Sequence, residues 1–102
     1  MMNQLPKKVS VGPFEYTVTE VERLAEKHGS LGEHIPFSSE ILIDSGLDWQ
    51  SKKQVFFHEV LHALEERFKL EIGGEGADDK IDRMATVLLQ FLQDNNLIQW
   101  EK

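Results

Sequence analysis

Hydrophobic and polar residues alternate over the first part of the chain. On either side of Gly12–Pro13, apolar side chains fall at alternate positions, and these are Val9, Val11, Phe14, Tyr16 and Val18. Such alternation is typical of half-buried strands, and a Gly-Pro pair marks a turn. The pattern predicts two short strands joined by a tight connection.

The segment that follows is compatible with more than one structure. Thr19–Glu22 has the spacing of a helical capping box and is followed by apolar residues at helical spacing, so both a short helix and a continuing strand are possible. Further on, Ile35–Phe37 and Ile41–Ile43 predict two more short strands. Pro36 favours an edge position for its strand, because proline has no backbone N–H to donate.

The second half of the chain changes to a helical period. Apolar residues recur at helical spacing from a capping box at Ser51 to about Leu70, and again from about Ala77 to Asp94. Gly73–Gly76 separates the two segments and predicts a turn. We therefore expect an α+β fold, with a small antiparallel or mixed sheet followed by two packed helices, in a single domain covering residues 1–102.

Composition and charge narrow the possible functions. The net charge of −7 opposes broad affinity for nucleic acid or an anionic membrane. With no cysteine in the chain, disulfides, thiol catalysis and cysteine-based zinc sites are excluded, so any metal must be held by His, Asp and Glu. The sequence contains neither an apolar run of signal-peptide length near its start nor a membrane-spanning stretch, and we expect a cytoplasmic location.

One motif in the first of the two helices carries recognisable chemistry. Residues 58–62 read His-Glu-Val-Leu-His, the HExxH pattern. Side chains four residues apart lie on one face of a helix, so His58 and His62 can reach one metal ion. Zinc suits two neutral imidazoles and a carboxylate, and the remaining position is left to water or substrate. The motif predicts a zinc site in which Glu59 activates a zinc-bound water.

A third protein ligand is expected from the next helix, after the glycine-rich turn. The helical period puts Asp78 on the buried stripe that includes Ala85, with Asp82 one turn further along. Glu75 would need the turn to fold inward and ranks last. An aspartate in a first helical turn is also stabilised by the helix macrodipole without any metal, so both interpretations of Asp78 stay open.

Other polar residues have simpler interpretations. Glu65 shares a face with the two histidines, where it is either solvated or orients one of the rings. We interpret His34 as a surface or locally hydrogen-bonded histidine, and Tyr16 as a strand residue that packs on the sheet.

The chain resembles the small HExxH proteins of phage and mobile-element genomes and, more distantly, the ImmA/IrrE metallopeptidases and the wider gluzincin group. The resemblance covers roughly residues 31–95, and it is carried by Leu31-Gly32-Glu33, the strand Ile41 to Asp44, His58 to Leu64, and Asp78 to Asn95. It implies a minimal zincin-like core. It also implies an acidic third ligand, usually Glu, seven positions before an alanine, which maps onto Asp78 before Ala85. Aspartate is one methylene shorter, so the second helix must approach closely, or Asp82 or Glu75 ligates instead.

The resemblance further implies a zinc metallopeptidase acting on a peptide or protein substrate. The strand containing Ile41, Leu42 and Ile43 would then be the edge strand that pairs with an extended peptide. Two alternatives remain: a catalytically weak or inactive zinc-stabilised binding or regulatory module, and an acidic structural protein without metal. The sequence does not specify the substrate, the oxyanion-stabilising group or the oligomeric state.

Overall fold

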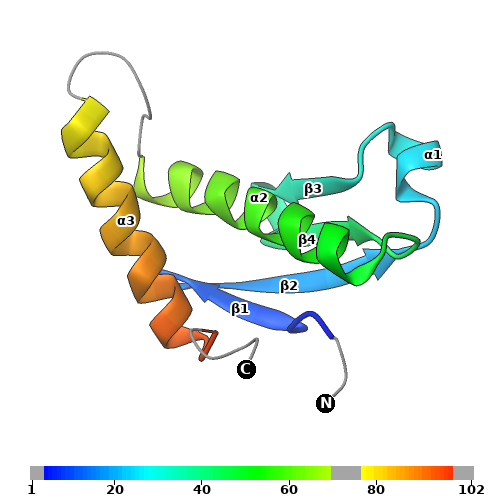
Figure 1. Ribbon diagram of the computed structural model, residues 1–102, viewed down its shortest axis with the longest axis horizontal. Helices are drawn as coiled ribbons and strands as arrows, with labels where there is room; N and C mark the ends of the chain where they lie inside the picture. Colours follow the sequence, from blue (N-terminus) through cyan, green and yellow to red (C-terminus); the bar gives the residue numbers. More distant parts are fainter. Residues whose placement is uncertain (1–3, 70–76, 98–102) are drawn as a thin grey trace.

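The computed structural model describes residues 4–69 and 77–97, with only the backbone described for 77–83. Within these residues the chain forms a four-stranded sheet, two long helices, one short helix and one 3-10 turn (Figure 1). In chain order the elements are β1 (Lys8–Val11), β2 (Phe14–Val21), α1 (Leu24–His28), β3 (Gly32–Ile35), η1 (Pro36–Ser38), β4 (Glu40–Asp44), α2 (Trp49–Phe68) and α3 (Ala77–Asp94). The predicted α+β class is confirmed.

The sheet is mixed, with strand order β1-β2-β4-β3. β1 pairs antiparallel with β2 through the turn at Gly12, β2 pairs parallel with β4, and β3 pairs antiparallel with β4. Gly12 has φ of 59°, a conformation that glycine adopts without steric cost. The buried side chains of the two central strands alternate along the chain, so that one face of the sheet forms the floor of the core.

The expectation that Ile41, Leu42 and Ile43 form an edge strand is wrong. These residues belong to β4, which lies between β2 and β3. Ile41 and Ile43 are fully buried, which reflects hydrogen-bonded neighbours on both sides and a helix above. The edge strand beside α2 is β3, which ends at Ile35, so the strand predicted over Ile35–Phe37 is wrong after its first residue. Pro36 begins the 3-10 turn η1, because proline has a fixed φ and no N–H to continue a ladder.

The ambiguous segment 19–28 adopts both predicted structures in succession. β2 continues to Val21, and the five-residue helix α1 follows after Arg23, which has φ of 58°. Asp44 ties this region to the end of β4, because its carboxylate accepts hydrogen bonds from the N–H groups of Ala25 (2.9 Å) and Gly46 (2.8 Å). These two donors lower the pKa of Asp44, the bond from Ala25 most strongly, while burial acts in the opposite direction.

The long helix α2 begins earlier than its sequence pattern suggests. Its N-cap is Asp48, which has extended backbone angles and accepts a 2.7 Å hydrogen bond from the N–H of Ser51. That hydrogen bond lowers the pKa of the Asp48 carboxyl. Ser51 therefore lies inside the first turn instead of capping the helix, because an aspartate three residues earlier already occupies the capping position.

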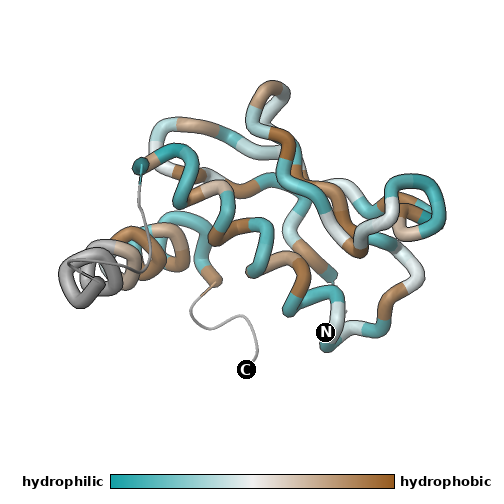
Figure 2. Tube along the Cα trace, turned by 90° about the horizontal axis from the view of Figure 1, so that it is seen from above, coloured by the Kyte–Doolittle hydropathy of each residue, from teal (hydrophilic) through white to brown (hydrophobic). Residues whose placement is uncertain are grey.

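Helix α2 lies across one face of the sheet, over β3 and β4, and its inner side forms the core (Figure 1). Apolar and polar residues alternate along this helix with its period, visible as alternating brown and teal in Figure 2. The fully buried side chains it shares with the sheet include Tyr16, Leu64, Phe56, Val60, Ile41 and Ile43. Leu61 is 38% exposed, on the side of the helix toward α3.

Helix α3 has the predicted bounds and runs from near the C-terminal end of α2 to β1 (Figure 1). Phe91 is buried near its end. Asn95, just past the helix, holds this end to the sheet edge: its Oδ1 accepts from the N–H of Ser10 (2.8 Å), and its Nδ2 donates to the carbonyls of Ser10 (3.0 Å) and Phe91 (2.9 Å). One side chain thus satisfies both main-chain groups of an edge-strand residue.

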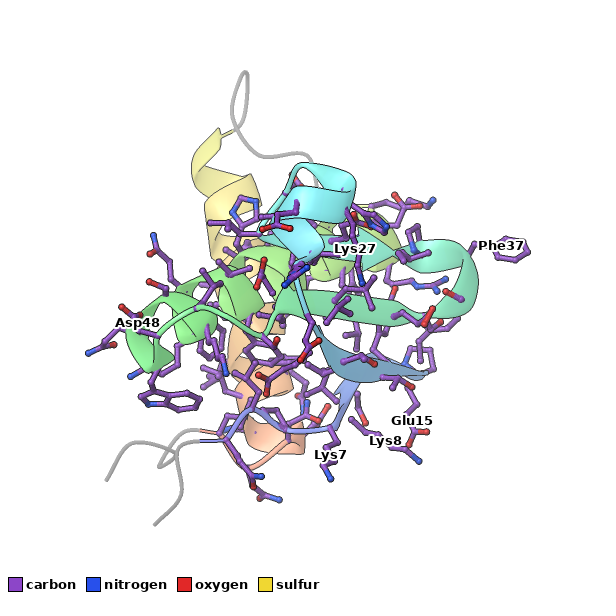
Figure 3. The ribbon with its side chains drawn as sticks, turned by 90° about the vertical axis from the view of Figure 1, so that its right-hand side faces the viewer. Lys7, Lys8, Glu15, Lys27, Phe37 and Asp48 are labelled. Carbon is purple, nitrogen blue, oxygen red and sulfur yellow. The ribbon has the colours of Figure 1, made fainter. Side chains whose placement is uncertain are left out.

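The surface around the strands carries both charged pairs and exposed apolar side chains, the latter including Phe14, Leu31 and Phe37. Lys8 and Glu15 form an exposed ion pair across β1 and β2 at 3.8 Å, and Phe37 projects fully exposed from η1 (Figure 3). In the part of the chain that the structure describes, no helix combines the length and apolar composition that a membrane span requires.

Candidate metal centre

The two histidines of the motif lie one turn apart on the outer side of α2. Their Nε2 atoms are 3.1 Å apart, and the ring centroids are 4.7 Å apart at an interplanar angle of 77°. Both side chains are exposed. The helical spacing therefore brings the two ring nitrogens close to each other.

The position of these nitrogens fits one metal ion. Nitrogens bound to tetrahedral zinc at about 2.0–2.1 Å lie roughly 3.3 Å from each other, close to the 3.1 Å observed between His58 and His62. Aromatic nitrogens facing each other at this distance cannot both carry a proton without a close H···H contact, so at least one is an acceptor. Two imidazole nitrogens are ligands that suit zinc.

Glu59 belongs to α2, and its side chain packs against Gly32 of β3, the edge strand of the sheet. The residue is 7% exposed, and the glycine at position 32 makes room for it, since a Cβ there would come within 3.3 Å of Glu59 Cγ and 2.4 Å of Val55 Cγ1. Burial raises the pKa of the Glu59 carboxyl, the nearby imidazoles of the motif lower it, and Glu33 raises it again. A carboxylate with a raised pKa is suited to accept a proton and return it.

The candidates for a third ligand lie at or before the start of α3. Asp78 and Asp82 lie in the first turns of α3, but their side chains fall outside the described residues, and Glu75 lies outside them altogether. Among the side chains that are described, no three of His, Asp and Glu converge closely enough to hold a metal ion. Ala85, seven residues after Asp78 in the same helix, lines a cavity with both motif histidines. The backbone of α3 therefore brings the predicted face of that helix to the candidate site.

A cleft of about 650 Å³ runs between β3 and α2 beside the motif. Its lining includes Glu59 and His62 from α2 and Gly32 and His34 from β3, together with Glu33, Pro36, Glu65 and Glu66. This volume lies within the range of about 300–1,000 Å³ common for ligand sites. The lining is strongly acidic, and the edge strand forms one wall.

Three residues that the sequence interpretation did not connect form a network at one end of this cleft. Arg67 Nε donates a 2.7 Å hydrogen bond to the hydroxyl of Tyr16, and that hydroxyl lies 3.2 Å from His34 Nε2. Since Arg67 donates to the oxygen, the hydroxyl hydrogen is available to His34 Nε2, which leaves the proton of the neutral ring on Nδ1. Burial lowers the pKa of His34, as do the charges of His62 and Arg67, while Glu66 opposes them.

The same arginine holds the turn after β3. Its guanidinium donates to the carbonyl of Pro36 (2.9 Å) and to the hydroxyl of Ser39 (3.1 Å), and it stacks 3.9 Å from the centre of the Phe14 ring. Arg67 thus connects α2 to β2 and to the turn between β3 and β4, at the end of the cleft. Tyr16 is fully buried, as expected for a strand tyrosine, but its hydroxyl also orients a cleft histidine. No sequence signal indicated this, because the three residues are far apart along the chain.

Glu65 has a position consistent with the orienting role that the sequence left open. Its Oε1 lies 3.6 Å from His62 Nδ1, on the opposite side of the ring from the nitrogen that faces His58. A carboxylate at the second nitrogen of a ligating imidazole fixes the tautomer and raises the basicity of the metal-facing nitrogen.

Comparison of the chain with protein-family models, with curated proteins and with solved structures finds no match.

Proposed function

We propose that this chain is a zinc-dependent peptidase in which His58 and His62 bind the metal and Glu59 is the general base. The observation that carries the proposal is the convergence of the two Nε2 atoms at 3.1 Å beside a buried carboxylate at the floor of an open cleft. Two histidines and an adjacent glutamate in this arrangement are the elements that metal-assisted hydrolysis requires.

We assign the third ligand to Asp78, with Asp82 and Glu75 as alternatives. Support comes from α3: Ala85 lines a cavity with His58 and His62, and Asp78 lies two helical turns earlier. Zinc bound by these residues would supply a Lewis acid that polarises the scissile carbonyl and lowers the pKa of a water.

In the proposed reaction, the chain's own groups bind the peptide and move the proton. Glu59 takes a proton from the attacking water and passes it to the amine that leaves, and its raised pKa favours this return. His34 is the candidate donor to the carbonyl oxygen, because Tyr16 and Arg67 hold its ring and leave the Nδ1 proton available. Glu65 keeps His62 oriented.

The substrate in this proposal is an extended peptide paired with β3. Asp44 N–H donates to the carbonyl of Leu31, and the hydrogen-bonded pairs of an antiparallel ladder alternate from there. By this alternation the main-chain groups of Gly32 and His34 point away from β4, toward the outer edge of the sheet. A peptide strand added at that edge would run beside Glu59 and His62.

The direct test is Glu59→Gln. The amide keeps the size of the side chain but cannot accept the proton, so hydrolysis of an unfolded protein substrate should fall by at least about 100-fold. Zinc content, measured by metal analysis of the purified protein, should stay at one ion per chain. Hydrolysis should also stop with a chelator and return with added zinc.

Two results would contradict the proposal in different ways. Full activity of the Glu59→Gln variant would show that Glu59 is not the general base. One zinc ion per chain with no hydrolysis of unfolded proteins or peptides would instead favour a zinc-stabilised binding module. Purified protein without zinc, and without affinity for added zinc, would leave an acidic structural protein.

A further inference from the structure

The cleft between β3 and α2 has charge of one sign. Among the described residues, its lining contains four carboxylates and no lysine or arginine, and the carboxylates belong to Glu33, Glu59, Glu65 and Glu66. The whole chain has a net charge of −7, so the field outside the cleft has the same sign. A cleft with this charge attracts cationic groups.

Two of these carboxylates face histidines, and one does not. Glu33 Oε1 lies 2.6 Å from His28 Nδ1, and Glu65 Oε1 lies 3.6 Å from His62 Nδ1. Glu66 is exposed, and in the part of the chain that the structure describes no hydrogen bond or ion pair reaches it. Glu66 is therefore the carboxylate of the cleft wall that is left for a ligand.

The fourth carboxylate, that of Glu59, is buried and points into the cleft. Only 7% of the residue is exposed, and no hydrogen bond from another described residue reaches its carboxylate. Every fully buried polar side-chain atom of the described residues has a partner, so the oxygens of Glu59 reach the cleft that it lines. An enclosed carboxylate without a donor of its own favours positive charge brought into the cleft.

Strand β3 and helix α2 run along the cleft in the same direction. Gly32 packs against Glu59, and two residues later His34 lies close enough to Glu66 for the charge of that glutamate to favour the protonated ring. The β4 partners of Gly32 and His34 are fully buried, so these two residues lie on the face of the sheet that α2 covers. A peptide strand added outside β3 presents every second side chain to this face, toward α2.

The spacing of the two elements gives the register of such a peptide. Glu66 lies one helical turn beyond His62, about 5.4 Å along the helix axis. Two residues of an extended strand span about 6.6 Å. When one peptide side chain lies beside His62, the next side chain on the same face therefore lies opposite Glu66.

We infer that the β3 cleft binds a lysine or arginine side chain of the peptide substrate, paired with Glu66 and two residues along the strand from the residue beside the metal. The inference rests on the proposed function, because it needs a peptide paired with β3 at the His58–His62 site. The bound peptide removes water from the Glu66 carboxylate. A cationic side chain replaces that hydration, whereas an apolar one does not.

The test measures binding and requires no turnover. Zinc-loaded Glu59→Gln protein keeps the peptides intact, and it is titrated with two fluorescently labelled peptides of about nine alternating alanine and threonine residues. Their central residue is either lysine or norleucine, which has the same four-carbon chain without the ammonium group. By fluorescence anisotropy, we expect the lysine peptide to bind at least about fivefold tighter in about 20 mM salt, and less than about twofold tighter in about 0.5 M salt.

Two charge-removing substitutions in the same background locate the preference. Glu66→Gln should reduce the difference between the two peptides to less than about twofold at low salt. Glu22→Gln is the matched control, because Glu22 is also exposed and its replacement changes the net charge equally, but it does not line the cleft. It should keep the preference, and both variants should keep one zinc ion per chain.

The other outcomes overturn the inference. Equal affinity of the lysine and norleucine peptides would show that the cleft does not select a cation. A preference that persists in Glu66→Gln would exclude Glu66 as the partner, and an equal loss in Glu22→Gln would attribute the preference to the net charge of the protein. Absence of zinc binding would overturn the proposed function and the inference together. Selective binding by a zinc-loaded protein whose wild type hydrolyses no peptide would contradict only the proposed catalysis.

Discussion

Gly32 of β3 lies directly against Glu59 of α2, with the position of a hypothetical Cβ 3.3 Å from Glu59 Cγ. The nearest atom is Val55 Cγ1 at 2.4 Å, from the preceding turn of the helix. The edge strand can approach the motif helix this closely only because residue 32 has no side chain. The distance between β3 and Glu59, and so the width of the cleft, depends on this glycine.

Gly32→Ala should therefore move β3 away from α2. We expect unfolding free energy to fall by about 1–3 kcal/mol, the usual cost of overpacking, as measured by urea denaturation. Val55→Ala removes the closest contact, so the double variant Gly32→Ala/Val55→Ala should be more stable than the sum of the single effects predicts. Strict additivity of the two substitutions would contradict the close contact.

The third ligand can be identified by zinc affinity. His58→Ala and Asp78→Ala should each weaken zinc binding by more than about 100-fold, since even loss of a group that only orients a ligand costs about 10–100-fold. Competition with a chromophoric chelator gives the affinities. Asp82→Ala and Glu75→Ala are the comparison variants and should change affinity by less than about threefold. A large loss of zinc affinity in either comparison variant, with unchanged affinity in Asp78→Ala, would identify that residue as the third ligand instead.

The network at the end of the cleft predicts a separation of catalysis from metal binding. His34→Ala should lower kcat by about 10²–10³-fold if the ring donates to the carbonyl oxygen, and the zinc content should not change. His28→Ala is the control, because His28 bonds to Glu33 at 2.6 Å without lining the cleft. A His34→Ala variant with normal kcat and raised KM would restrict His34 to substrate binding.

Asp44 predicts how stability depends on pH. Its folded-state pKa lies below the ordinary value, so its contribution is fully present above the unfolded pKa of about 3.9 and is lost as the pH falls through the folded pKa. Denaturant midpoints measured from pH 7 down to pH 2 should fall most steeply below about pH 4. Asp44→Asn should be less stable at pH 7 and should show a shallower acid limb. An acid limb identical to that of the wild type would show that other carboxylates control it.

Asn95 should be important for attaching α3 to the sheet. Asn95→Ala leaves the N–H and carbonyl of Ser10 without their side-chain partners, and we expect a loss of about 1–3 kcal/mol of unfolding free energy. Gln93→Ala, at an exposed position of the same helix, should change stability by less than about 0.5 kcal/mol. Equal stability of the two variants in urea denaturation would contradict the proposed attachment.

Local patterns accounted for most of the elements but not for their neighbours in space. The alternation around Gly12 and the helical period from Ala77 to Asp94 predicted the first two strands and the last helix, because both patterns depend on a repeat within one element. The sequence interpretation wrongly put β4 at the edge of the sheet, whereas it lies between β2 and β3. Strand order depends on pairing between distant segments, and the local pattern put the preceding strand at Ile35–Phe37 instead of Gly32–Ile35 without indicating that it pairs with Ile41 and Ile43.

For the candidate site, the sequence alone determined that His58 and His62 share one face of a helix, since four residues make about one helical turn. It also determined that Glu59 directly follows the first of these histidines along the chain. Tertiary structure alone determined what surrounds them. It buried Glu59 under Gly32, joined Arg67, Tyr16 and His34 across three elements, and placed an apolar cavity beside the histidines. These contacts join residues up to 51 positions apart. No local period describes them, because they arise only when the sheet and the two helices pack together.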